Sequence, residues 1–93
     1  MQIVRSKKYT KSLQGIMRFI SLDSKNRALE FRNELDKQIS NIINMPHKCR
    51  KSIYFDDHDI RDLIYKGYTI VYKVDEEKSV ITVLGIKKYK EEL

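Results

Sequence analysis

The sequence has one cysteine, one proline and no tryptophan, and it has no long apolar run. A lone cysteine, Cys49, cannot form an internal disulfide, which excludes a small secreted scaffold held by disulfides. A membrane-spanning helix needs about 20 apolar residues, and the N-terminus MQIVRSKKYT has no apolar segment of the kind that directs secretion. We therefore expect a cytoplasmic protein without a membrane anchor.

The chain is short and basic. Its 93 residues predict one domain, residues 1–93, because chains divide at about 100 to 200 residues per domain. Nineteen Lys and Arg against thirteen Asp and Glu give a net charge of +6. This charge favours a polyanion or an acidic protein as partner, and nucleic acid, nucleic-acid-bound machinery and an acidic peptide all remain open.

Two amphipathic helices are predicted in the first half of the sequence, after a short extended segment at residues 2–5. Residues 21–24 separate them, where Asp23 or Ser24 can cap the second helix, and Pro46 ends it. The two sets of apolar residues at helical spacing are Tyr9, Leu13, Ile16, Met17 and Ile20, then Ala28, Phe31, Leu35, Ile39 and Ile42.

Strands are predicted in the second half, where apolar residues alternate or are β-branched. With turns at Lys66–Gly67 and at residues 75–78, residues 60–86 form a three-stranded antiparallel meander. The predicted fold class is α+β in the order β-α-α-β-β-β. A small antiparallel sheet, with residues 2–5 as an edge strand, is covered by an N-terminal antiparallel helical hairpin.

The sequence favours neither a metal site nor a cysteine nucleophile. DDHD at residues 56–59 offers oxygen and nitrogen ligands, but the spacing of a calcium loop is absent and His47 lies too far along the chain to complete a zinc set. We expect a solvated turn there, with no metal and no cofactor. Cys49 and His47 do not have the arrangement of a catalytic triad.

Two basic clusters border the predicted sheet: Lys48, Arg50 and Lys51, and then Lys87, Lys88 and Lys90 with Tyr89 between them. Such lysines can simply be solvated, or they can bind phosphates. Cleavage of RNA would need a base, an acid and a cation. Lysines and a tyrosine can supply the cation and the acid, but no histidine or carboxylate is clearly placed to be the base.

Three segments together resemble the RelE/ParE superfamily of bacterial type II toxins. They are SKNRALEFRNELDKQISNIINMP (24–46), DIRDLIYKGYTIVYKV (59–74) and SVITVLGIKK (79–88), and the resemblance covers nearly the whole chain. It implies a toxin that a cognate antitoxin protein neutralises. It also implies that operator DNA is bound only through the antitoxin, and a homodimer remains possible.

The RelE-like branch implies a ribosome-dependent mRNA endoribonuclease. Its members carry an arginine directly after the tyrosine of the Gly-Tyr turn, whereas this chain has Thr69 there. The ribonuclease set, which resemblance would assign to Arg61, Lys87, Lys88 and Tyr89, therefore looks incomplete.

The ParE-like branch matches the chain better and implies a toxin that inhibits DNA gyrase by binding and is not an enzyme. The target-binding candidates are Lys87, Lys88, Tyr89 and Lys90. The ribonuclease, with the ribosome and mRNA as partners, is the alternative. An inactive member that only binds antitoxin or regulates is the second alternative.

Overall fold

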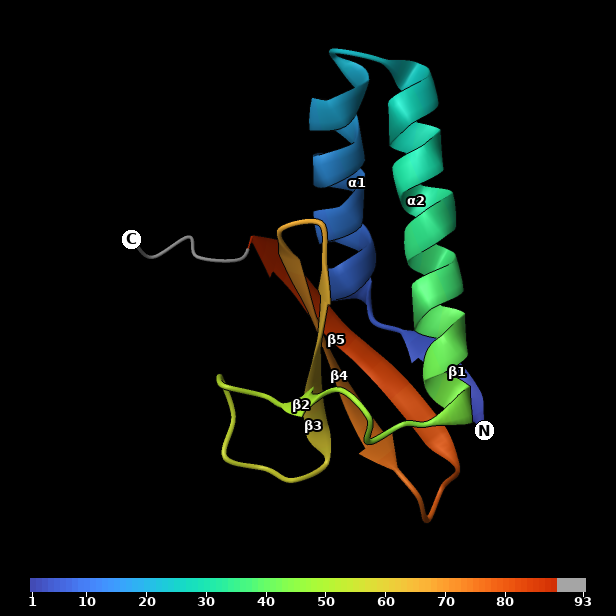
Figure 1. The fold of residues 1–93 in the computed structure, drawn as a ribbon, viewed down its shortest axis with the longest axis vertical. Coiled ribbons are helices and arrows are strands. Elements are labelled where there is room, and N and C mark those ends of the chain that lie inside the picture. Colours follow the sequence, from blue (N-terminus) through green and yellow to red (C-terminus); the bar gives the residue numbers. More distant parts are fainter. Residues whose placement is uncertain (89–93) are drawn as a thin grey trace.

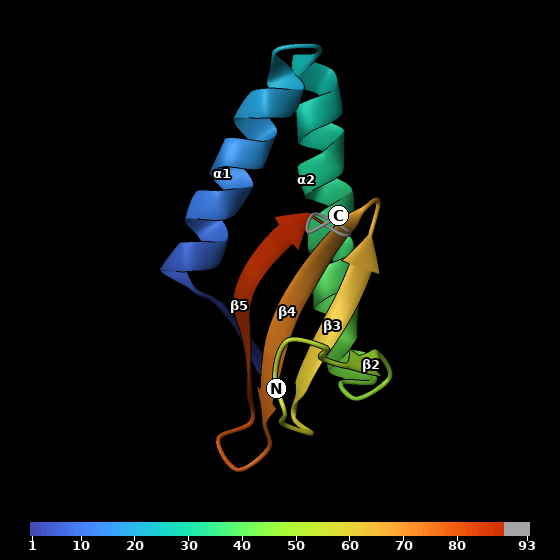
Figure 2. The same ribbon diagram turned by 90° about the vertical axis from the view of Figure 1, so that its left-hand side faces the viewer.

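The computed structural model describes residues 1–88. It begins with strand β1 (Gln2–Arg5), helix α1 (Lys7–Ser21) and helix α2 (Lys25–Ser40), which continues into the short 3-10 helix η1 (Asn41–Asn44). The two helices run side by side in opposite directions (Figures 1 and 2). The predicted helical hairpin is confirmed. No helix in the described part of the chain is long and apolar enough to cross a membrane.

Each helix begins at a serine that satisfies a backbone donor of the first turn. Ser6 Oγ accepts a hydrogen bond from Tyr9 N–H at 3.1 Å, and Ser24 Oγ accepts one from Arg27 N–H at 3.2 Å. The cap of α2 is therefore Ser24, one of the two residues that the sequence offered. Ser6 Oγ also donates to the carbonyl of Leu84 at 3.0 Å, which ties the start of α1 to the sheet.

Four strands follow the helices: β2 (Arg50–Lys51), β3 (Ile60–Tyr65), β4 (Tyr68–Asp75) and β5 (Val80–Lys88). The sheet has the order β1-β5-β4-β3-β2, and β3, β4 and β5 form the predicted antiparallel meander. The predicted α+β fold class is confirmed, but the sheet is mixed and not antiparallel throughout, because β1 pairs parallel with β5. The short strand β2 was also not predicted, since only two residues pair with β3.

The Lys66–Gly67 turn is confirmed as a two-residue hairpin loop. Both residues have positive φ, 47° at Lys66 and 84° at Gly67, as in the type I′ turns that match the twist of paired strands. The turn places Tyr65 opposite Tyr68. Both tyrosine rings lie 5.5 Å from the ring of Phe31 on α2, so the turn packs against the helical hairpin.

The core lies between the helical hairpin and one face of the sheet, which we call the helix face. A register shift in the β4–β5 pair leaves Leu84 without a partner, because Val71 pairs with Gly85 and Tyr72 with Val83. The shift lets β5 direct side chains three residues apart to the same face. The buried cluster consists of Tyr9, Leu13, Phe31, Leu35, Ile39, Ile42, Ile70, Tyr72, Val74, Ile81, Val83 and Ile86.

Candidate functional site

The other face of the sheet, the open face, is not covered by helices (Figure 2). Residues that pair across strands share a face, so one row of this face contains Asp62, Val71 and Gly85. The next row contains Ile64, Thr69 and Lys87. Part of this surface is covered only by the loop between β2 and β3.

A shallow pocket of about 290 Å³ opens between this loop and β5. We call it the open-face pocket. Gly85 contributes no side chain, and a Cβ atom added there would meet nothing within 4 Å. The pocket is lined by Lys8, Tyr54, Phe55, Val71, Leu84, Gly85, Ile86 and Lys87. Its lining is thus mainly apolar, with one lysine from α1 and one from β5.

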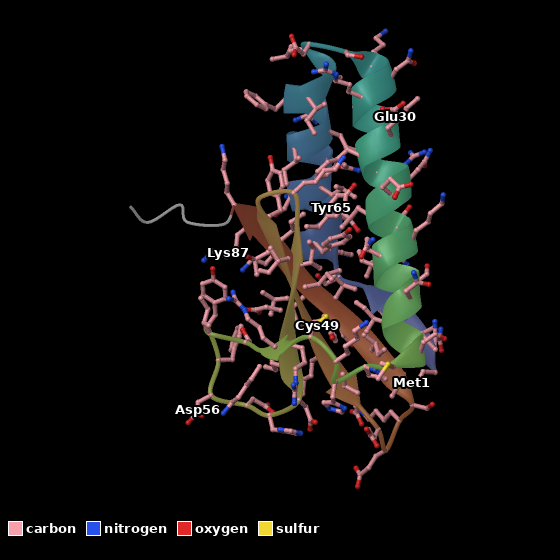
Figure 3. The ribbon with its side chains drawn as sticks, in the orientation of Figure 1. Met1, Glu30, Cys49, Asp56, Tyr65 and Lys87 are labelled. Carbon is pink, nitrogen blue, oxygen red and sulfur yellow. The ribbon has the colours of Figure 1, made fainter. Side chains whose placement is uncertain are left out.

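Lys87 connects the end of β5 to the loop. Its Nζ lies 4.2 Å from the ring centroid of Tyr54, which is within the range of a cation–π interaction. Figure 3 shows Lys87 on the same side of the molecule as the loop that contains Asp56. Around it, Ile53, Phe55 and Ile64 are 65%, 48% and 43% exposed. The open face therefore presents apolar and aromatic groups beside positive charge.

Asp62 holds the loop from the open face. Its side chain is fully buried, and Oδ2 accepts hydrogen bonds from Ile53 N–H and from Arg50 Nη2, both at 3.2 Å. Oδ1 of Asp62 and the hydroxyl of Thr69 are buried without a hydrogen-bond partner within residues 1–88. Two polar atoms thus lie unpaired on this face.

Arg61 lies on the helix face, since it pairs with Tyr72 in the sheet, and it holds both the segment before β2 and the loop between β2 and β3. Its Nε donates to the carbonyl of His58 at 2.9 Å, and its Nη1 donates to the carbonyls of His47 and Cys49 at 3.2 and 3.0 Å. The residue is only 9% exposed. Sequence reasoning missed this anchoring role, because the carbonyl partners lie in loops without a recognisable motif.

The structure does not bring the residues of the ribonuclease alternative together. Lys87 and Lys88 are successive residues of a strand and point to opposite faces of the sheet. Both lysines border a groove beside α1, and Lys87 also lines the open-face pocket. Arg61 is buried two strands away from them. Tyr89 and Lys90, the other candidates, lie outside the described residues.

The buried tyrosines of the core are structural groups. Burial, with a smaller contribution from the negative charge of Asp36, raises the pKa of Tyr9 to about 12. Burial also raises the pKa of Tyr72, whose hydroxyl donates to the carbonyl of Pro46 at 2.7 Å. Both phenols therefore stay neutral at physiological pH.

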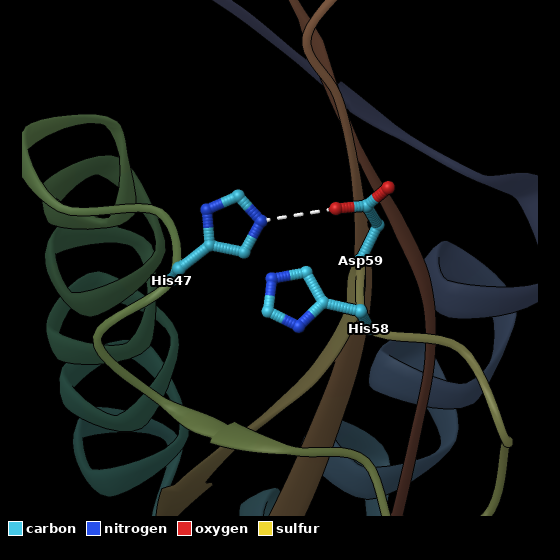
Figure 4. Close-up of side chains that lie close together, drawn as sticks. All are labelled: His47, His58 and Asp59. Carbon is cyan, nitrogen blue, oxygen red and sulfur yellow. Dashed lines mark hydrogen bonds and ion pairs between the residues drawn. The ribbon is translucent and has the colours of Figure 1, made fainter.

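A second cluster of polar side chains lies near the ends of the strands away from the Lys66–Gly67 turn. The premise that His47 is too far from residues 56–59 is wrong, because its Nε2 lies 3.1 Å from Asp59 Oδ1. His58 joins them with its ring stacked on that of His47 (Figure 4). These residues are the group within residues 1–88 that has the donors for a metal ion.

Comparison with known families assigns the chain. The family model described as ParE toxin of type II toxin-antitoxin system, parDE, matches residues 3–93. The protein therefore belongs to the ParE toxin family, within the RelE/ParE superfamily that its sequence motifs resemble. No protein among curated sequences matches the chain.

Solved structures share the fold at low sequence identity. A chain of the chromosomal ParDE system from P. aeruginosa matches with a TM-score of 0.76 and 15% identity, over 97% of each chain. The isolated E. coli RelE toxin matches with a TM-score of 0.66 and 20% identity, over 97% of this chain and 85% of that one. A chain of the intact E. coli RelBE complex matches with a TM-score of 0.65 and 18% identity, over 95% of this chain and 100% of that one.

Proposed function

We propose that this ParE-family toxin inhibits DNA gyrase by binding to it, and that it is not an enzyme. The observation that carries the proposal is the position of Arg61, whose guanidinium is buried and donates to three loop carbonyls. A group held in this way is not free to stabilise a cleaved phosphate. Arg61 anchors a binding loop in this proposal, and the toxin acts through the surface that the loop helps to form.

The open-face pocket is the proposed contact surface. Its apolar lining, with Tyr54 and Phe55 on one side, suits an apolar or aromatic side chain of a protein partner. Lys8 and Lys87 at the same pocket suit carboxylates beside that side chain. We therefore expect the target segment to carry an apolar anchor next to acidic residues. Lys88, on the other face of the sheet, and Tyr89 and Lys90, outside the described residues, stay target-binding candidates from the sequence.

Gly85 allows a steric test of the pocket in a supercoiling assay with purified gyrase. Gly85 does not adopt a positive φ, and an added Cβ atom would meet nothing within 4 Å, so the backbone accepts a side chain there. Gly85→Leu fills the pocket and should weaken inhibition on the order of tenfold, equivalent to about 1.4 kcal/mol. Gly85→Ala is the matched control and should inhibit like the wild type. Equal inhibition by the leucine variant would exclude the pocket as the contact.

Pulse labelling in bacteria after induction distinguishes the three functions. If DNA synthesis fails first, gyrase is supported as the target. If protein synthesis fails first, the RelE-like ribonuclease is favoured, and Lys87, Lys88 and Tyr89 become the residues to substitute. Unchanged growth and unchanged incorporation of both labels would indicate the inactive, antitoxin-binding member.

An antitoxin is the second proposed partner. The ParDE and RelBE systems among the structural matches contain toxin–antitoxin pairs, and the net charge of +6 suits an acidic, partly disordered segment. The affinity should fall as salt rises, because screening weakens exposed charge pairs. Titration calorimetry at low and high salt tests this. An unchanged affinity would mean that charge attraction does not contribute to antitoxin binding. Adding operator DNA to the toxin–antitoxin complex tests whether the toxin reaches DNA only through the antitoxin. Light scattering of the free toxin tests whether it forms a homodimer.

A further inference from the structure

Three segments far apart in the sequence meet near the ends of β3 and β4. The loop after η1 contributes His47, the loop before β3 contributes His58 and Asp59, and the β4–β5 turn contributes Glu76. His47 Nε2 lies 3.1 Å from Asp59 Oδ1, and the donor atoms of His47, His58 and Asp59 all lie within 4.8 Å of one another. Figure 4 shows these three side chains converging from two loops.

The donor set suits a transition-metal ion of borderline softness. Imidazole nitrogens and a carboxylate oxygen bind zinc at about 2.0 to 2.2 Å, so two ligand atoms of a tetrahedral site lie about 3.3 Å apart. The separation of 3.1 Å between His47 and Asp59 is already close to that value. The stacked imidazoles have centroids 5.2 Å apart with planes at 18°, and the exposed His58 can rotate to bring a nitrogen to the same point.

Carboxylates around the cluster favour a cation there. Glu76 Oε2 lies 3.7 Å from His47 Nδ1, the ring nitrogen that faces away from Asp59. This distance is longer than a hydrogen bond, but the exposed Glu76 carboxylate can move closer to accept the Nδ1 proton, which would orient the ring and increase the basicity of Nε2. Asp57 adds a further negative charge, since its Oδ1 accepts the backbone N–H of Asp59 at 2.9 Å.

The guanidinium of Arg61 opposes a cation at this cluster. Its Nη2 lies 3.2 Å from Nδ1 and 3.3 Å from Nε2 of His58. Nearly equal distances to both nitrogens mean that Nη2 does not lie along the lone pair of either one. Both nitrogens therefore keep a direction open to a metal. Three carboxylates, those of Asp57, Asp59 and Glu76, outweigh this single positive charge.

We propose that His47, His58 and Asp59 bind one zinc ion, with a water molecule as fourth ligand and Glu76 as the positioning residue for His47. The ion would join the loop after η1 to the loop before β3. Tyr54 and Phe55 lie along the chain between His47 and His58, so zinc would hold both ends of the segment that carries them. The proposal does not depend on which cellular target the toxin binds.

Cobalt and zinc titrations of the tag-free, chelator-treated protein test the site. The wild type should take up one Co²⁺ per chain with visible absorption bands, and Zn²⁺ should displace it. His58→Gln and Asp59→Asn should each weaken zinc binding on the order of 100-fold or more, and Glu76→Gln about tenfold. Zinc should raise the melting temperature of the wild type by several degrees and that of His58→Gln by much less.

Asp56→Asn is the matched control, because Asp56 is a fully exposed carboxylate of the same loop and forms an ion pair with Lys51, away from the histidines. It should bind zinc like the wild type. His58 decides the test, since it is exposed and its replacement does not disturb the core. No metal uptake, or equal affinity in His58→Gln and Asp56→Asn, would overturn the proposal.

Discussion

The two faces of the sheet are covered in different ways. On the helix face, two helices bury a continuous apolar cluster that includes Ile70, Tyr72 and Val83. On the open face, a loop without regular structure lies over part of the sheet, and Asp62 and Arg61 hold it through hydrogen bonds to Ile53 N–H and to the carbonyl of His58. The helix face provides most of the stability, whereas the open face leaves apolar and basic groups accessible. Polar anchors allow a small domain to present such a surface without giving up its core.

The sharpest test of this difference compares two isoleucines of neighbouring strands. Ile70→Ala removes a fully buried side chain from the helix face and should lower the free energy of unfolding by about 2 to 5 kcal/mol. Ile64→Ala removes a side chain that is 43% exposed on the open face and should cost about 1 kcal/mol or less. Urea unfolding measures both. Similar losses would mean that the two faces contribute alike.

The loop anchor should come next in size. Asp62→Ala leaves Ile53 N–H without its acceptor and removes one partner of Arg50, at 3.2 Å, which should cost about 1.5 to 3 kcal/mol. Asp56→Ala, in the exposed part of the same loop, should change stability by about 0.5 kcal/mol or less. Hydrogen exchange should show faster exchange in residues 50–59 of the Asp62 variant alone. Unchanged protection there would mean that the loop is held by other contacts.

Two core tyrosines offer a comparison within the helix face. Tyr72→Phe removes the hydrogen bond to the carbonyl of Pro46 and should cost about 1 kcal/mol. Tyr9→Phe should cost almost nothing, because the hydroxyl of Tyr9 is buried without a partner in the described structure. Thermal unfolding at neutral pH distinguishes them. A large loss for Tyr9→Phe would show that its hydroxyl has a partner, such as water.

The Tyr9 side chain should have the smallest effect on stability near neutral pH and a larger effect at alkaline pH. The pKa of Tyr9 is raised from 10.0 to about 12 in the fold, so the neutral phenol is the favoured form. The stability that the neutral Tyr9 phenol contributes to the folded state is therefore fully present below pH 10. This stability is lost as the pH rises toward about 12. Urea unfolding at pH 8 and pH 11 should show a smaller drop for Tyr9→Phe than for the wild type. An identical drop would contradict the assignment.

Local patterns in the sequence predicted most of the fold. The helical spacing of Leu13, Phe31 and Leu35 identified the hairpin, and Lys66–Gly67 identified a turn that the backbone angles bear out. What the sequence did not reveal are pairings between distant segments. The parallel pairing of β1 with β5 depends on where the helical hairpin returns the chain, and β2 is too short to have a periodic pattern.

The site was less predictable than the fold. Lys87, a target-binding candidate from the sequence, borders the open-face pocket. The pocket itself depends on Gly85 and on a loop packed by Asp62, and neither has a local signature. In the sequence Arg61 resembled a catalytic cation, because a sequence does not show that its side chain donates to backbone carbonyls. The contact of His47 with Asp59 likewise joins residues separated by a loop and a strand.

The pairing of β1 with β5 has a consequence for synthesis of the toxin. The first strand of the chain has no partner until residues 80–83 have left the ribosome, and Ile81, Val83 and Ile86 complete the core only then. Contacts of such high sequence separation form late in folding. A nascent chain that stops before β5 therefore lacks both an assembled core and the floor of the open-face pocket. Incomplete chains of this toxin should therefore be inactive, and the toxin should become active only after the whole sheet has been translated.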